Sequence, residues 1–141
     1  MKIYFAGPLF SEAERDYNLK IASKLREQGW EVWLPQENQP EKFNASFIYD
    51  MDIEHLEKAD VVVANLDGVD VDSGTAFEIG YATAKGKKVF GLKTDQRAFS
   101  NLEEINLMIE VPAIIRRDID SLITVVKESV HQRKKSNHTK I

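Results

Sequence analysis

Short apolar runs alternate with longer amphipathic stretches along the 141 residues of this chain. The runs have the length and β-branched content of buried strands, and apolar residues that recur every three or four positions indicate helices. This pattern predicts strands at residues 2–6, 30–34, 60–66, 87–92 and 112–115. It predicts helices at residues 11–29, 44–58, 73–85, 103–109 and 118–131, with a polar loop at 35–44.

Local signals support several of these boundaries. Ser11 and Glu14 have the spacing of a capping box, which marks the start of a helix. Gly29 and Gly86 stand where the first and third helices should stop. The run at 60–66 is apolar on both faces, which is typical of a central strand in a parallel sheet.

The alternation of strands and helices predicts an α/β fold with a doubly wound, five-stranded parallel sheet and helices on both faces. The strand order is not readable from the pattern, and the flavodoxin-like order 2-1-3-4-5 is the simplest hypothesis. We expect a single domain at residues 1–131, followed by a basic, flexible tail at residues 132–141.

Composition narrows the function classes. The formal net charge of −4 argues against a nucleic-acid-binding domain, and the absence of cysteine excludes a disulfide framework or a thiolate metal site. No stretch is long and apolar enough for a transmembrane helix, and the N-terminus enters a strand without a signal peptide, so a cytoplasmic protein is expected.

Known cofactor motifs are missing from the sequence. There is no GxGxxG turn after the first strand and no P-loop, and the three histidines form no evident site. A calcium loop starting at Asp70 would put Thr75 and Tyr81 where glycine and glutamate belong, so no metal is expected there.

Two carboxylates stand where a loop becomes a helix, just after the strand at 60–66. Asp72 and Glu78 occupy the edge at which open α/β sheets place their ligands. One interpretation is that these are ordinary carboxylates favoured by a helix N-terminus. The other is that the helix N-terminus holds Glu78 ionised, ready to attack carbon or to stabilise a developing cation. Asp50 and Asp52, on the preceding helix, are equally good partners by pattern alone.

Four blocks of this sequence, kept in order, resemble the nucleoside 2-deoxyribosyltransferases. They are residues 3–8, 60–66, 72–82 and 106–108, and the resemblance extends over about residues 2–115. The acidic block at 72–82 is the most specific. The resemblance implies an enzyme that transfers 2-deoxyribose between purine or pyrimidine bases, with retention, through a deoxyribosyl-glutamyl intermediate and without a cofactor.

The resemblance also implies catalytic roles for individual residues. Glu78 matches the nucleophile that attacks the anomeric carbon, and Tyr4 matches the tyrosine that orients it. Asp52, 26 residues before Glu78, matches the residue that handles the proton of the base, and this spacing favours it over Asp50. Asp72 matches the carboxylate that binds the sugar 5′-hydroxyl.

Further residues are expected at the substrate. Ser73 and the turn at Gly7 are expected to bind substrate, and their hydrogen-bond donors would also suit a phosphate. The resemblance implies that Asn106 and Met108 reach into the site of a neighbouring subunit, so a homo-oligomer is expected. The aromatic side chains of Phe10 and Trp33 are candidates for stacking on the base, or equally for core positions. The expected partners are deoxyribonucleosides and free nucleobases, and neither a nucleic acid polymer nor a membrane.

Two alternative functions stay open. A related 2′-deoxynucleoside 5′-monophosphate N-glycosidase would release the sugar phosphate to water. Asp72 argues against it, because a carboxylate accepts from a 5′-hydroxyl and repels a 5′-phosphate. A non-catalytic nucleotide-binding module on the same fold is the other alternative, and it would not need Asp52, Asp72 and Glu78 together.

Overall fold

The computed structural model describes the backbone of residues 1–138 and the side chains of residues 1–132. Its elements in chain order are β1 (Lys2–Ala6), α1 (Glu12–Arg26), β2 (Glu31–Trp33), the 3-10 helix η1 (Pro35–Glu37), α2 (Ala45–Lys58), β3 (Val61–Asn65), α3 (Ser73–Ala84), β4 (Lys88–Leu92), α4 (Leu107–Glu110), β5 (Ala113–Arg116) and α5 (Ile119–His138). Within the described part of the chain, no helix is long and apolar enough to cross a membrane.

The five strands form one parallel sheet with the order β2-β1-β3-β4-β5. This confirms the predicted α/β class and the flavodoxin-like order. The chain first moves from β1 outward to β2 and then returns to the other side of β1 with β3. The ends of β1 and β3 therefore form the switch point at which such sheets open a crevice for ligands.

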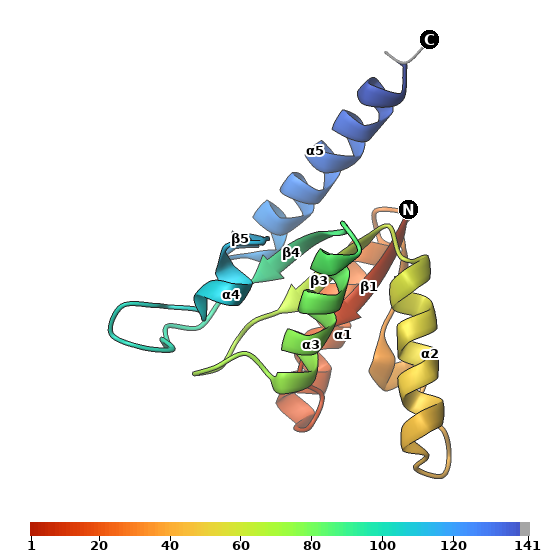
Figure 1. Ribbon diagram of the computed structural model, residues 1–141, viewed down its shortest axis with the longest axis vertical. Coiled ribbons are helices and arrows are strands. Elements are labelled where there is room, and N and C mark those ends of the chain that lie inside the picture. The colour runs from red at the N-terminus through yellow and green to blue at the C-terminus, as the bar shows by residue number, and fades with distance from the viewer. Residues whose placement is uncertain (139–141) are drawn as a thin grey trace.

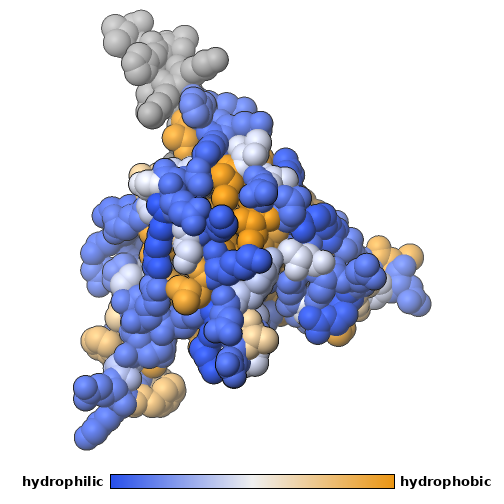
Figure 2. Space-filling model, turned by 180° about the vertical axis from the view of Figure 1, so that it is seen from behind, coloured by the Kyte–Doolittle hydropathy of each residue, from blue (hydrophilic) through white to orange (hydrophobic). Residues whose placement is uncertain are grey.

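Helices cover both faces of the sheet, and alternate residues of each strand feed two separate cores. Ile3 and Phe5 face a core shared with α1 and α5, whereas Tyr4 and Ala6 face a core shared with α2, α3 and α4. Figure 1 shows α3 in front of β1 and β3, with α1 behind them. Seen from behind, the surface is largely hydrophilic, with a narrow hydrophobic stripe near its middle (Figure 2). Tyr4 is thus placed on the α2/α3 side by the two-residue period of its strand.

The predicted helix signals act as expected. The Ser11 side chain accepts from the backbone N–H of Glu14, and the Glu14 side chain accepts from the N–H of Ser11, which completes the capping box. Gly29 follows α1 with a φ of 80°, a conformation that disfavours residues with a β-carbon. Without these caps, the terminal backbone N–H and C=O groups of α1 would depend on water for their hydrogen bonds.

Some boundaries differ from the prediction. The helix expected at 103–109 is the shorter α4, whose first N–H groups are satisfied by the Asn106 side chain, which accepts from Met108 N–H at 3.0 Å. α5 continues to His138, past the predicted end at 131, because helix propensity persists beyond its apolar face. The tail predicted at 132–141 stays a prediction, since side chains beyond Gln132 and all residues beyond His138 fall outside what the structure describes.

Candidate active site

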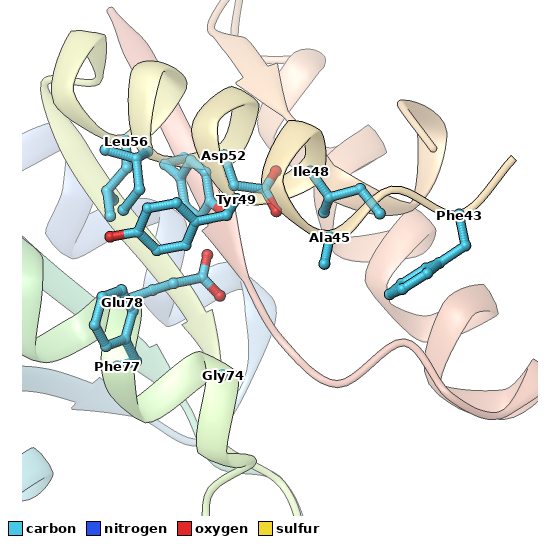
Figure 3. Close-up of a pocket in the computed structure, with 11 residues that line it drawn as sticks. Phe43, Ala45, Ile48, Tyr49, Asp52, Leu56, Gly74, Phe77 and Glu78 are labelled. Carbon is cyan, nitrogen blue, oxygen red and sulfur yellow. The ribbon is translucent and has the colours of Figure 1, made fainter. Parts of the chain in front are cut away.

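A cavity of about 320 Å³ opens between α2 and α3 and is bounded by Tyr4 of β1. It is lined by Tyr4, Phe43, Ala45, Ile48, Tyr49, Asp52, Ile53, Leu56, Gly74, Phe77 and Glu78. Figure 3 shows Glu78 extending from α3 toward α2, which carries Tyr49 and Asp52. Three elements that are far apart in sequence, β1, α2 and α3, therefore bring two carboxylates and two phenols to one cavity.

Glu78 projects from α3 into this cavity, and its Oε2 atom is shielded from solvent without a hydrogen-bond partner among the described residues. Burial raises the pKa of its carboxyl to about 7, because the charged form loses its water. The hydroxyl of Tyr4 opposes this rise, and the negative charges of Asp52 and Asp72 add to it. Burial therefore opposes the ionised state of Glu78 that the helix N-terminus was expected to favour, and the role of Glu78 stays a prediction.

Tyr4 lies opposite Glu78 and is completely buried. Its hydroxyl also lacks a hydrogen-bond partner of good geometry in the described residues. Burial raises the pKa of the phenol, and the nearby charges of Glu78 and Asp52 raise it further, so Tyr4 stays protonated. It is close enough to Glu78 for the phenol to lower the pKa of that carboxyl, although no well-formed hydrogen bond joins the two groups.

These two unpaired atoms are the clearest sign of a ligand site. Buried polar groups in native proteins are nearly always hydrogen-bonded, and exceptions need a reason. Here both exceptions line the same cavity and come from different elements, β1 and α3. A ligand that enters the cavity would meet an acceptor on Glu78 and a donor on Tyr4.

Asp52 is the second carboxylate at the cavity. It follows Tyr49 by three residues and precedes Leu56 by four, so these side chains share one face of α2. Burial raises the pKa of Asp52, while the indole N–H of Trp33 and the charge of His55 lower it. Asp50, which the pattern alone could not separate from Asp52, is exposed and does not line the cavity.

Asp72 has an evident structural task. It is the N-cap of α3, and its Oδ2 accepts from the backbone N–H and the hydroxyl of Thr75, both at 2.9 Å. Its Oδ1 makes no hydrogen bond to the part of the protein that the structure describes. Asp72 itself is not in the cavity lining, but its charge acts on Glu78 across one and a half turns of the helix.

The remaining predicted site residues do not line the cavity. Ser73 is exposed at the start of α3. A β-carbon on Gly7 would come within 3.0–3.2 Å of Phe5, Asn65 and Asn18, so close packing alone explains this glycine. Asn106 caps α4, as described above. The Met108 side chain, in the first turn of α4, is 75% exposed.

Neither aromatic candidate for base stacking lines the cavity. Phe10 is 75% exposed in the loop after β1. The ring of Trp33 stacks on His55 and does not line the cavity.

Sequence reasoning missed three aromatic residues that do line the cavity: Phe43, Tyr49 and Phe77. Phe43 falls in the predicted polar loop and is 86% exposed. The rings of Tyr49 and Phe77 lie 6.3 Å apart across α2 and α3. Their presence at exposed positions was the available signal, since large exposed aromatics usually serve a binding surface.

Comparison with known proteins agrees with this geometry. Residues 3–134 match the family model described as nucleoside 2-deoxyribosyltransferase. A 2-deoxyribosyltransferase from Bacillus psychrosaccharolyticus is 30% identical, with a TM-score of 0.76 over 87% of this chain and 90% of that one. A conserved protein from Enterococcus faecalis is 31% identical, with a TM-score of 0.77 over 92% and 98% of the two chains. A protein of Thermofilum pendens, named as a candidate 2′-deoxynucleoside 5′-phosphate N-hydrolase, is 30% identical over 115 residues, 77% of this chain and 76% of its own.

Proposed function

The chain belongs to the nucleoside 2-deoxyribosyltransferase family, whose enzymes act on N-glycosidic bonds, and we propose on that premise that it transfers 2-deoxyribose between nucleobases. The observation that carries the proposal is the pair of buried, unpaired atoms, Oε2 of Glu78 and the hydroxyl of Tyr4, beside Asp52 in one cavity. A carboxylate nucleophile with a second carboxyl for the proton is the arrangement that retaining glycoside chemistry requires.

In the first step, the Glu78 carboxylate attacks C1′ of the deoxyribose on the face opposite the base. The C1′–N bond breaks, its electron pair goes to the base nitrogen, and Asp52 gives the base a proton. The product is a deoxyribosyl ester of Glu78. In the second step, a nitrogen of another base attacks C1′, Asp52 takes the proton from that base, and the ester bond breaks to release Glu78.

The charges of the two carboxyls are coupled, so the site favours states in which only one of them carries a proton. The negative charge of Asp52 is one of the causes that raise the pKa of Glu78. A proton on Asp52 removes that charge, so protonated Asp52 and ionised Glu78 stabilise each other. The resulting state has the donor and the nucleophile that the first step needs. Tyr4 then orients the ionised Glu78 by donating its hydroxyl hydrogen.

Asp72 is proposed to accept a hydrogen bond from the sugar 5′-hydroxyl through Oδ1, the oxygen that α3 capping leaves free. The Thermofilum relative gives the hydrolase alternative a concrete basis. A negative charge at position 72 opposes a 5′-phosphate, which supports a free nucleoside as the substrate. Ser73 and Gly7 are proposed as further hydrogen-bond donors to the substrate.

We also propose that the active enzyme is a homo-oligomer in which Asn106 and Met108 complete the site of a neighbouring subunit. The exposed apolar side chains around α4 support this, since Leu107, Met108 and Val111 are 50%, 75% and 81% exposed. The expected setting is the cytoplasmic salvage of deoxyribonucleosides, with no cofactor.

A direct assay separates the candidate functions. The protein is incubated with deoxyinosine or thymidine, with and without adenine, and with the corresponding 5′-monophosphate. Deoxyadenosine that forms only when adenine is present supports transfer. Base release that needs no acceptor and is fastest from the monophosphate would replace transfer by hydrolysis.

Two variants connect the reaction to the site. Glu78→Ala is expected to abolish turnover, whereas Asp50→Asn, two residues from Asp52 but outside the cavity, should act like the wild type. Full activity in Glu78→Ala would refute the mechanism. A Glu78→Ala protein that keeps its ligand affinity and its biological effect would favour a non-catalytic binding module.

A further inference from the structure

Asp52 has a polar neighbour that does not line the cavity, namely the indole of Trp33. Trp33 is the last residue of β2 and the registered partner of Tyr4 on β1, so both side chains stand on the α2 face of the sheet. The Trp33 Nε1–H donates to Oδ1 of Asp52 at 3.4 Å, a long bond. Among the described residues, the Trp33 N–H is the hydrogen-bond donor to the Asp52 carboxyl.

The orientation of Trp33 is set by His55. The two rings are stacked with centroids 3.4 Å apart and an angle of 13° between their planes. The His55 Nδ1 lies 2.8 Å from the carbonyl oxygen of Met51, and because a carbonyl only accepts, Nδ1 carries a hydrogen. The histidine ring is therefore tied to its own helix and forms a fixed surface for the indole.

Asp52 and His55 are three residues apart on α2, so Trp33 touches two successive side chains of one helix face. The hydrogen bond and the stack connect the end of β2 to α2 at adjacent points. An indole N–H is a donor and cannot accept. Oδ1 of Asp52 must therefore serve as an acceptor, and a proton on this carboxyl has to reside on Oδ2.

We propose that Trp33, held by His55, is a positioning residue that confines the exchangeable proton of Asp52 to Oδ2, the oxygen left to the base. This role rests on the function proposed above. It explains why Trp33 is half-buried beside α2 instead of lining the cavity, where a stacking residue would stand.

The electrostatics agree with the geometry. Burial raises the pKa of Asp52, and the Trp33 N–H and His55 lower it. The charged groups that share the small cavity beside the stacked rings are Lys2, Glu31 and Lys58, which carry mixed signs. Loss of the N–H leaves Asp52 free to rotate and to place its proton on either oxygen.

The test compares two leaving groups. Deoxyinosine needs a proton for its base to depart, whereas 7-methyl-2′-deoxyguanosine already carries a positive base that leaves neutral. Single-turnover release of the base, measured by rapid quench without an acceptor, isolates the step in which Asp52 gives its proton. Trp33→Phe keeps an aromatic ring against His55 but has no N–H.

The expected result for Trp33→Phe is about a tenfold slowing with deoxyinosine, a part of the roughly 10²–10⁴ that a general acid contributes, and about wild-type rates with the methylated substrate. The apparent substrate affinity should stay within about twofold, since the indole does not line the cavity. Asp52→Asn should show the same selective loss, only larger.

The matched control is Trp30→Phe, which also removes an indole N–H. Trp30 packs against the other core, on the α1 side of the sheet, and should release both bases at the wild-type rate. Should Trp33→Phe fold poorly, benzothienylalanine at position 33 in the Trp30→Phe background removes the N–H at nearly constant shape.

The outcomes separate this role from the proposed function. Equal slowing with both substrates would mean that Trp33 only supports the fold, and the positioning role would be overturned while transfer stands. An unchanged rate with deoxyinosine would overturn it as well. If the wild type releases neither base, the proposed function itself fails.

Discussion

Replacing Tyr4 with phenylalanine is expected to raise the pKa of Glu78 further. Burial already places that pKa at about 7, and the phenol hydroxyl is the group that lowers it. The substitution removes one oxygen atom from a fully buried side chain and keeps the ring that packs between α2 and α3. The hydroxyl has no hydrogen-bond partner of good geometry among the described residues, so the substitution breaks no well-formed hydrogen bond there.

The size of the effect follows from the titration curve. With a pKa of about 7, about half of Glu78 is ionised at pH 7, and roughly nine-tenths at pH 8. A rise of one unit, about 1.4 kcal/mol, would reduce the ionised fraction at pH 7 to roughly one-tenth, which is about a fivefold loss of nucleophile. The loss should vanish about two pH units higher, where Glu78 is ionised in both proteins.

The assay is the pH dependence of kcat/KM for deoxyinosine with adenine as acceptor. The acid limb of the wild-type profile reports Glu78 in the free enzyme and should lie near pH 7. Tyr4→Phe should move this limb to higher pH. Asp72→Asn should move it to lower pH, because the charge of Asp72 raises the pKa of Glu78.

The control for a tyrosine hydroxyl at the cavity is Tyr49→Phe. Tyr49 lines the same cavity but is not among the causes of the Glu78 shift, so the limb should stay in place. Limbs of Tyr4→Phe and Asp72→Asn that move in the same direction would refute the assignment of the limb to Glu78.

Three further predictions concern the same residues. Glu78→Gln should be more stable than the wild type at pH 8 but not at pH 4, because the wild-type pKa of Glu78, about 7, exceeds its unfolded-state value of 4.5. The contribution of Glu78 to wild-type stability is fully present below pH 4.5 and falls by about 3 kcal/mol as the pH rises through 7. Thermal melts of both proteins at pH 4 and pH 8 test this. Asp72→Asn should raise KM for deoxyinosine and lower the ratio of kcat/KM for deoxyinosine to kcat/KM for its 5′-monophosphate. An unchanged ratio would contradict this role of Asp72. Gly91→Ala should destabilise the fold by about 1–3 kcal/mol in urea titration, because its β-carbon would stand 2.5 Å from Leu66 Cδ1; an unchanged midpoint would show that Leu66 yields freely.

Much of the fold was readable from the chain itself. Alternating apolar runs and amphipathic stretches predicted the parallel sheet, because each buried strand needs a helix to return the chain to the same edge. The strand order was only the simplest hypothesis for five strands, and the structure established it. Local signals were enough for the helix starts at Ser11 and after Asp72, since a cap involves only a few neighbouring residues. Within the block at 72–82, the sequence singled out Glu78 as the carboxylate to test.

The protonation of the site depended on the tertiary structure. Only the phase of α2 turns Asp52, and not Asp50, toward the cavity, and only the strand register brings Tyr4 and Trp33 to the same face. The pKa of Glu78 near 7 arises from burial by elements distant in sequence, which no local pattern records. Sequence determines which groups can titrate, whereas the surrounding packing determines how much water each charge keeps, and therefore where its proton resides.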